Sequence, residues 1–158
     1  MSFALRPLRP GDLGWVIERH GALYAADKGW DLRFEALVAG IAADYIKSLD
    51  PARENAWIAE REGERVGSVF LVRREATVAQ LRLLLVEPSA RGLGIGARLV
   101  DECTRFARAT GYGTIRLWTN GTLLSAIKIY RAAGYRLIAE DPTDEYGDQT
   151  WELALPHG

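Results

Sequence analysis

The feature that most constrains the fold is a glycine-rich segment between an apolar strand pattern and a helical one. Residues 80–86 are leucine-rich, Glu87-Pro88 follows them, and Arg91-Gly92-Leu93-Gly94-Ile95-Gly96-Ala97 comes next. Glycines let a backbone approach a ligand closely, and the first N–H groups of a helix have no partner within it. Together with the helix dipole and Arg91, they predict an anion cradle suited to a pyrophosphate.

Two common nucleotide-binding motifs share such glycines but do not match this segment. A Walker motif ends in Gly-Lys-Ser/Thr, where this chain has Gly96-Ala97-Arg98. A Rossmann fingerprint follows the first strand of a parallel βαβ unit and has an acidic residue after the next strand. Here three strand patterns precede the loop, and Arg116-Leu117-Trp118 occupies the next strand. We therefore expect neither a P-loop nor a Rossmann site.

The hydrophobic period changes several times along the chain. Segments that alternate every second residue predict strands at 3–8, 56–61, 65–73, 77–86, 114–119, 135–139 and 150–155. Apolar residues three and four apart predict helices after Asp12, which we expect at the N-cap, after Asp31, after Pro88 and over 123–133. The order β-α-α-β-β-β-α-β-α-β-β predicts one α/β domain over residues 1–158, with a mixed, mostly antiparallel central sheet flanked by helices.

Composition excludes several classes of function. Lys and Arg total 20 against 21 for Asp and Glu, so the net charge of −1 gives no electrostatic basis for binding nucleic acid or a membrane surface. Cys103 is the only cysteine, which excludes an intramolecular disulfide and a cysteine-based metal cluster, although a catalytic thiol stays open. No segment approaches the ~20 apolar residues of a membrane span. We expect a cytoplasmic protein without a metal.

Two motifs in order resemble one enzyme family. Arg91-Gly92-Leu93-Gly94-Ile95-Gly96, preceded by Leu84-Leu85-Val86-Glu87-Pro88, is similar to the acetyl-CoA signature of the GNAT superfamily of N-acetyltransferases. Residues 127–135 resemble that family's late helix, in which a tyrosine precedes a Gly-Tyr pair. Within the superfamily, the chain most resembles acetyltransferase domains that also occur fused to MarR-type regulators. The resemblance implies the acyl-CoA N-acyltransferase fold.

The resemblance also implies a reaction and a set of cofactor contacts. Acetyl-CoA is the cosubstrate, and its acetyl group passes to a primary amine of a small molecule by direct attack in a ternary complex. Backbone N–H groups of the last β-strand before the loop hold the pantetheine arm and the acetyl carbonyl, where they stabilise the developing negative charge. The residues assigned to the cofactor are Leu84, Leu85, Val86, Arg91, Gly92, Leu93, Gly94, Ile95, Gly96, Ala97 and Asn120.

Asn120 is assigned to the cofactor in place of an asparagine that this chain lacks at the usual family position. Many family members have an asparagine seven residues before the late-helix tyrosine, where this chain has Leu123. Asn120 ends the preceding strand and could contact the cofactor from a displaced loop. The alternative is that Asn120 is a turn or helix-cap residue before Gly121.

The resemblance assigns Tyr130 as the general acid that protonates the departing thiolate. A phenol has a pKa of ~10 and a thiol one of ~8.5, so a neutral tyrosine can donate to a thiolate within hydrogen-bond reach. The alternative is a core aromatic residue. No side chain is a compelling general base, and His20 is expected only as a face residue of the first helix. We therefore expect a carboxylate acting through water or an amine that arrives neutral.

The acceptor pocket is expected to include Trp30, Gln80, Arg82 and Trp118. Arg82 alternates with apolar residues and is unlikely to be buried without a partner. It either pairs with a carboxylate of a neighbouring strand such as Glu60, or it holds a carboxylate of the acceptor. Strand alternation also predicts that Leu81, Leu83 and Leu85 share one core face.

Other functions stay open at this stage. The same fold could serve as a non-catalytic coenzyme A-binding sensor or interaction module, and a larger pocket could admit a longer acyl-CoA. The sequence does not identify the amine acceptor, and a homodimer is compatible with it.

Overall fold

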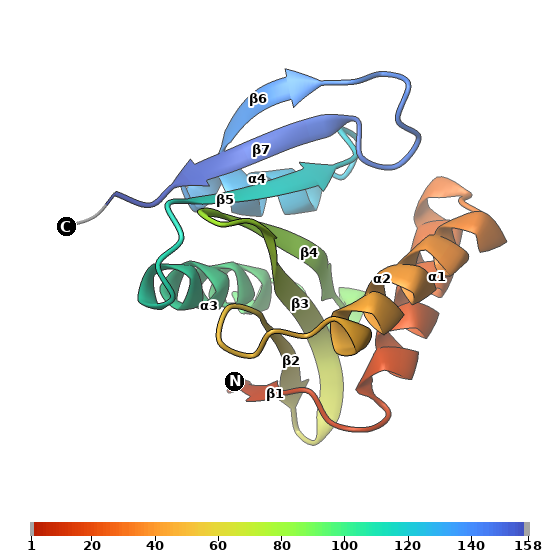
Figure 1. Cartoon of the computed structure of the whole chain (residues 1–158). Helices are drawn as coiled ribbons and strands as arrows, with labels where there is room; N and C mark the ends of the chain where they lie inside the picture. The colour runs from red at the N-terminus through yellow and green to blue at the C-terminus, as the bar shows by residue number, and fades with distance from the viewer. Residues whose placement is uncertain (1, 157–158) are drawn as a thin grey trace.

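The computed structural model of the chain describes residues 2–156 and has the element order that the sequence predicts (Figure 1). The strands are β1 (Ala4–Pro7), β2 (Asn55–Arg61), β3 (Glu64–Glu75), β4 (Val78–Val86), β5 (Thr114–Thr119), β6 (Arg136–Glu140) and β7 (Gln149–Ala154). The helices are α1 (Asp12–Lys28), α2 (Leu32–Lys47), the 3₁₀-helix η1 (Pro88–Ala90), α3 (Ile95–Ala109) and α4 (Leu124–Ala132).

All seven strands form one sheet in the order β1-β2-β3-β4-β5-β7-β6. Neighbouring strands are antiparallel except β4 and β5, which are parallel because α3 carries the chain across between them. The predicted mixed, mostly antiparallel sheet flanked by helices is therefore confirmed. Its single parallel pair lies in the middle of the sheet, next to the glycine-rich loop.

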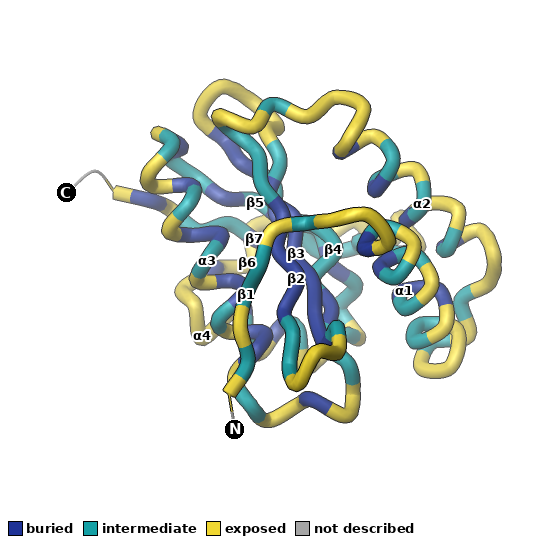
Figure 2. The backbone as a smooth tube through the Cα atoms, turned by 90° about the horizontal axis from the view of Figure 1, so that it is seen from below, coloured by how far each residue is buried: buried dark blue, intermediate teal, exposed yellow. Residues whose placement is uncertain are grey.

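The sheet has an apolar core on each face. Along β2, Trp57 and Ala59 pack with α3 and α4, while Ala56 and Ile58 pack with α1 and α2. Figure 2 shows the buried residues concentrated on the central strands and the exposed ones on the outer helix surfaces and loops. Each face of the sheet thus has its own helical layer.

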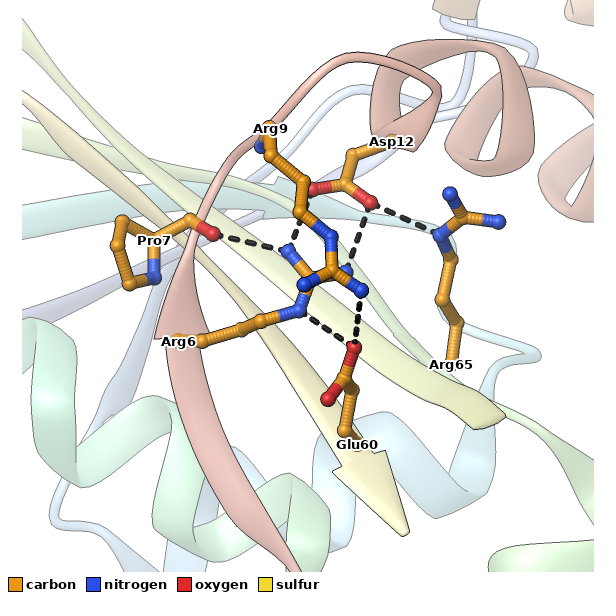
Figure 3. A network of polar contacts seen from close by, with 6 residues as sticks. All are labelled: Arg6, Pro7, Arg9, Asp12, Glu60 and Arg65. Carbon is orange, nitrogen blue, oxygen red and sulfur yellow. Dashed lines mark hydrogen bonds and ion pairs between the residues drawn. The ribbon is translucent and has the colours of Figure 1, made fainter. Parts of the chain in front are cut away.

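The start of α1 differs from the sequence prediction. Gly11, with φ of 97°, occupies the N-cap, and Asp12 is the first helical residue. The Asp12 carboxylate is fully buried and accepts the Arg9 N–H at 2.7 Å, two guanidinium N–H groups of Arg6 at 2.7 and 2.9 Å, and Arg65 Nε at 2.8 Å (Figure 3). Asp12 therefore joins β1, β3 and α1 instead of capping the helix. Asp31, in contrast, caps α2 by accepting the Arg33 N–H at 2.9 Å.

The structure bears on two expectations from the sequence, one about membrane spans and one about the cysteine. Within the described part of the chain, no helix has the length and apolarity needed to cross a membrane. Cys103 lies fully buried in the core under α3, and burial raises the pKa of its thiol. A buried, protonated thiol is not a nucleophile, so the structure removes Cys103 from the candidate catalytic residues.

Candidate active site

The parallel strands β4 and β5 separate shortly after they meet. In the described chain they pair only where Val78–Gln80 faces Thr114–Arg116. Beyond Gln80, β4 keeps its pairing with β3, and β5 keeps its pairing with β7 as far as Thr119. Figure 1 shows the two halves of the sheet diverging from this point. The edge of β4 that faces β5 thus presents backbone groups to the opening from Leu81 to Val86.

A β-bulge at Leu83 accompanies this separation. The β3–β4 register passes from Phe70–Arg82 to Ser68–Leu85, so β4 contains one extra residue. Leu83 has a φ of 53°, which is rare for a leucine, and its carbonyl accepts the Ser68 hydroxyl at 2.9 Å. Bulges bend a strand and increase its twist, which fits the divergence of β4 from β5.

The prediction that Leu81, Leu83 and Leu85 share one face is wrong because of this bulge. Leu81 belongs to the α3 and α4 core, whereas Leu83 packs with the α1 and α2 core. After the extra residue, Leu84 and Val86 pack against the α3 and α4 core. Simple alternation placed Leu81 and Leu83 on one face because it could not include an additional residue in the strand.

The glycine-rich loop turns directly into α3. Gly92 and Gly94 have φ values of 84° and 80°, and Gly94 is the N-cap without a side-chain cap. Arg98 is the first residue of α3 whose N–H donates to a helical carbonyl partner, that of Gly94, at 3.0 Å. The N–H groups of Ile95, Gly96 and Ala97 are those that a helix leaves for an anion.

Position 96 requires glycine because of close side-chain packing, not because of its backbone angle. A Cβ atom there would lie 2.5 Å from Cδ1 of Ile129, which is on α4. No atom lies within 4 Å of a Cβ built at Gly92 or Gly94, where positive φ alone favours glycine. The motif therefore combines two backbone turns with one close contact between α3 and α4.

A groove of about 790 Å³ runs along this loop and the separated end of β4. It includes most of the residues assigned to the cofactor: Leu84, Leu85, Val86, Arg91, Gly92, Gly94, Ile95, Gly96 and Ala97. Helix α1 contributes Tyr24 and Lys28, and α4 contributes Ser125 and Ile129. The volume lies within the range of cofactor sites, and the groove ends in the helix N-terminus where a phosphate is best held.

Two residues of the predicted set do not line this groove. Leu93 packs against the α3 and α4 core. Asn120 lines a different cavity, and its Oδ1 accepts the Thr122 N–H at 2.9 Å and the Thr122 hydroxyl at 2.6 Å. Its amide nitrogen donates to the Glu145 carbonyl at 3.2 Å. Asn120 therefore has the turn role that the sequence analysis gave as the alternative.

A second cavity of about 440 Å³ is lined by β4, β5, helices α1 and α2 and part of α4. Its wall contains all four residues expected in the acceptor pocket: Trp30, Gln80, Arg82 and Trp118. The groove and this cavity share Tyr24, Leu84, Leu123 and Ala126. Two ligands bound in them would meet at the separated strands.

Tyr130 of α4 lies where the cavity reaches through the opening between β4 and β5. Its ring is 5% exposed and lines the acceptor cavity. Burial raises the pKa of Tyr130 well above its ordinary value, and the nearby hydroxyl of Tyr24 raises it further. The phenol is therefore protonated at neutral pH and carries a hydroxyl hydrogen that can be donated in a hydrogen bond.

The sequence analysis missed several residues of the site. Tyr24 borders both cavities, and burial raises its pKa. His20 lines the acceptor cavity, with Nδ1 2.8 Å from the Val16 carbonyl and a buried Nε2 that has no hydrogen-bond partner among the described residues. Since a carbonyl only accepts, Nδ1 carries the proton and Nε2 has a free lone pair. Burial lowers the pKa of His20 to about 4, so this ring is neutral and a weak base.

Arg74 and Tyr146 also line the acceptor cavity, and no local motif in the sequence indicates either of them. Tyr146 follows a turn in which the Asp144 carboxylate accepts the N–H groups of Tyr146 and Gly147 at 3.0 and 2.9 Å. The acidic residues 140–148 thus include carboxylates that order their own loop.

The fold matches that of solved acetyltransferase structures. A GNAT-family acetyltransferase from Staphylococcus aureus Mu50 superposes with a TM-score of 0.82 at 18% identity, covering 98% of this chain and 100% of that one. PaiA N-acetyltransferase from Thermoplasma acidophilum, in complex with coenzyme A, has a TM-score of 0.77 at 20% identity and covers 98% and 100%.

The sequence comparison identifies the family. The chain belongs to the Acetyltransferase (GNAT) family, whose sequence model matches residues 18–135. N-acetylaspartate synthetase from Danio rerio is 32% identical over 110 residues, which are 69% of this chain and 37% of that protein. The chain spans about two fifths of the length of the first curated relatives that it matches. The particular likeness to domains fused to MarR-type regulators stays a prediction.

Proposed function

We propose that this protein transfers the acetyl group of acetyl-CoA to a primary amine of a small molecule, by direct attack in a ternary complex. The observation that carries the proposal is that two neighbouring cavities share Tyr24, Leu84, Leu123 and Ala126. A thioester in the groove and an amine in the acceptor cavity would meet at these shared residues. No covalent enzyme intermediate is needed when both reactants are held together.

The residues that line the groove, as well as its volume, suit acetyl-CoA. The N–H groups of Ile95, Gly96 and Ala97, together with Arg91, would hold the pyrophosphate. Backbone groups of Leu84 to Val86 would hydrogen-bond the pantetheine arm where β5 has separated from β4. One N–H of this segment would face the acetyl carbonyl, where such a donor contributes ~3 kcal/mol to the transition state.

The reaction then needs one proton donor at the sulfur. The amine nitrogen bonds to the carbonyl carbon, the carbon–sulfur bond breaks, and sulfur takes the proton of the Tyr130 hydroxyl. The nitrogen loses one proton, which restores the tyrosine through solvent. With a pKa of about 4, His20 is too weak a base to deprotonate an ammonium group, so the amine arrives neutral.

Thiol release from acetyl-CoA tests the proposed function. The purified protein would be assayed with a panel of amines, amino acids, aminoglycosides and peptides, alongside binding of acetyl-CoA by calorimetry. We expect release that depends on the acceptor. Acetyl-CoA binding without release by any acceptor would overturn the transferase and favour a coenzyme A-binding module. Preference for a longer acyl-CoA would replace acetyl as the transferred group.

Replacing Arg91 by alanine should weaken the cofactor site selectively. Arg91 is exposed at the end of the groove, so its charge contributes to the pyrophosphate contact under partial solvent screening. We expect the KM for acetyl-CoA to rise about tenfold with kcat within about twofold, because the contact is the same in ground and transition states. Arg105→Ala removes an exposed charge elsewhere on α3 and is the control. An unchanged KM in Arg91→Ala would contradict the assignment.

A further inference from the structure

Arg82 is a half-buried cation without an ion-pair partner inside the acceptor cavity. It lies on β4 opposite Phe70 and faces the α1 and α2 side of the sheet. The sequence analysis favoured Glu60 as its partner, and that expectation is corrected. Glu60 instead accepts Arg6 Nε at 2.6 Å and an Arg9 guanidinium N–H at 2.9 Å. In the described chain, neither an ion pair nor a carboxylate hydrogen bond involves the Arg82 guanidinium.

The surroundings of Arg82 disfavour its charged, protonated form. Burial lowers the pKa of Arg82, and the charge of Arg74 lowers it further, while Asp44 opposes both effects. A guanidinium that has lost part of its water and has a second cation beside it is stabilised by an anion. The cavity therefore offers an anion subsite at Arg82.

Arg74 provides a second cation on the same wall. It lines the cavity near the end of β3, and its guanidinium lies 4.3 Å from the ring centroid of Trp118. Gln80, opposite Val72 on β4, adds an amide donor to this wall. Stacking on Trp118 holds Arg74 in place without neutralising its charge.

The charges that face the cavity leave a net positive wall. Asp144 is the one carboxylate among the described lining residues, and the N–H groups of Tyr146 and Gly147 already bind its Oδ1. His20 is neutral near pH 7 because its pKa is lowered to about 4. The cavity thus contains the cations of Arg74 and Arg82 against one aspartate that is committed to its own loop.

The opposite wall is aromatic. Trp30 packs on Phe34 with ring centroids 4.7 Å apart, Tyr24 stacks on Trp30 at 5.4 Å, and Tyr146 contacts Trp30 at 5.0 Å. All four rings line the cavity. An acceptor that fits both walls has an anionic group at one side and an apolar body at the other.

Resting on the proposed function, we propose that the acceptor is an amino carboxylic acid with an apolar side chain, whose carboxylate binds Arg82 and Arg74. A carboxylate matches the two-pronged donor geometry of a guanidinium. Bound there, the acceptor packs its side chain on the aromatic wall and directs its amine along β4 to Leu84 and Tyr130. A simple amine of the same shape leaves both arginines unpaired, so the site discriminates against it.

The test compares amino acids with the amines that lack only the carboxylate. The pairs are leucine with isoamylamine and phenylalanine with phenethylamine, assayed at saturating acetyl-CoA. We expect wild-type protein to prefer the acid of a pair by at least about tenfold in kcat/KM. Arg82→Gln should lower kcat/KM for the acid by about ten- to a hundredfold and for the amine by less than about twofold. Arg82→Lys keeps the charge but not the planar guanidinium. Its kcat/KM for the acid should lie between those of wild type and Arg82→Gln.

Equal losses on acid and amine in Arg82→Gln, or a wild-type preference for amines, would overturn the proposal. Arg105→Gln controls for loss of charge on the other side of the molecule, and thermal melts show whether each variant is folded. Calorimetry of leucine and phenylalanine with the coenzyme A-saturated protein gives a readout that needs no turnover. Binding that Arg82→Gln abolishes would support the subsite even if thiol release failed, whereas absence of binding to wild-type protein would reject it.

Discussion

Tyr130→Phe is expected to lower kcat at saturating acetyl-CoA by about a hundredfold or more, with acetyl-CoA affinity within about twofold. The change removes one hydroxyl from a ring that stays 5% exposed, so packing is retained. What is lost is a buried, protonated hydroxyl in the wall of the second cavity. Without it, the thiolate must leave unprotonated or take a proton from water. Steady-state kinetics together with calorimetry of acetyl-CoA binding would measure both quantities.

Tyr135→Phe is a matched control for this variant. Tyr135 is a buried tyrosine whose ring centroid lies 5.7 Å from that of Tyr130, and its hydroxyl has no hydrogen-bond partner among the described residues. Removing that hydroxyl should leave turnover unchanged and stability equal or slightly higher, since it removes an unsatisfied buried group. Full turnover in Tyr130→Phe, or equal losses in both variants, would contradict the role of Tyr130 as the acid.

The largest effect on stability is expected from Asp12→Asn. The carboxylate is fully buried and joins β1, β3 and α1 through Arg6 and Arg65 (Figure 3). Asparagine has nearly the same shape but no charge, so Arg65 loses the carboxylate with which it pairs and Arg6 keeps only Glu60. Breaking such a pair costs about 3 kcal/mol or more. At this chain length, that loss lowers Tm by roughly 6–12 °C.

The Asp12 network also predicts how this loss depends on pH. Burial alone would raise the pKa of Asp12, but hydrogen bonds from Arg6, Arg9 and Arg65 lower it to about 2. Because the folded pKa is below the ordinary value of 3.8, the stabilisation is present above pH ~4 and is lost as the pH falls towards 2. The difference in unfolding free energy between wild type and Asp12→Asn should therefore be constant at neutral pH and shrink below pH 4.

Glu60→Gln offers a control within the same network. Glu60 shares Arg6 with Asp12, but its side chain is 23% exposed and solvent can replace part of its contacts. We expect a smaller loss than for Asp12→Asn. Denaturant unfolding of the three proteins would rank them, and an Asp12→Asn protein as stable as Glu60→Gln would show that burial of the carboxylate does not determine its contribution.

Local patterns were sufficient to predict the elements of this fold. Strands alternate and helices repeat at three to four residues, and these periods depend on neighbours in sequence. The glycine motif was equally readable, because Gly92 and Gly94 adopt positive φ and α3 begins directly after them. The pocket residues Trp30, Gln80, Arg82 and Trp118 were placed correctly in one cavity because strand alternation and the early helices already restricted their faces.

Other features depend on contacts between distant segments and left no local signal. The bulge at Leu83 is visible only against the register of β3, and the second cation of the cavity, Arg74, follows from how β3 continues past that register. Asp12 looked like a helix cap because its nearest neighbours in sequence fit one, whereas Arg65, 53 residues later, takes part of its carboxylate. The expected pair of Arg82 and Glu60 was wrong because Glu60 pairs with Arg6 of β1 and with Arg9 of the loop that follows it.

The divergence of β4 from β5 has a consequence for the order of events in turnover. The cofactor groove is lined by α3, α4 and the end of α1, whereas the acceptor cavity lies between the sheet and helices α1 and α2. The two ligands therefore have separate routes to and from one meeting point. An acetylated product can leave while coenzyme A is still bound, and coenzyme A can leave while an acceptor is bound. Product inhibition patterns should then show each product competing with its own precursor alone.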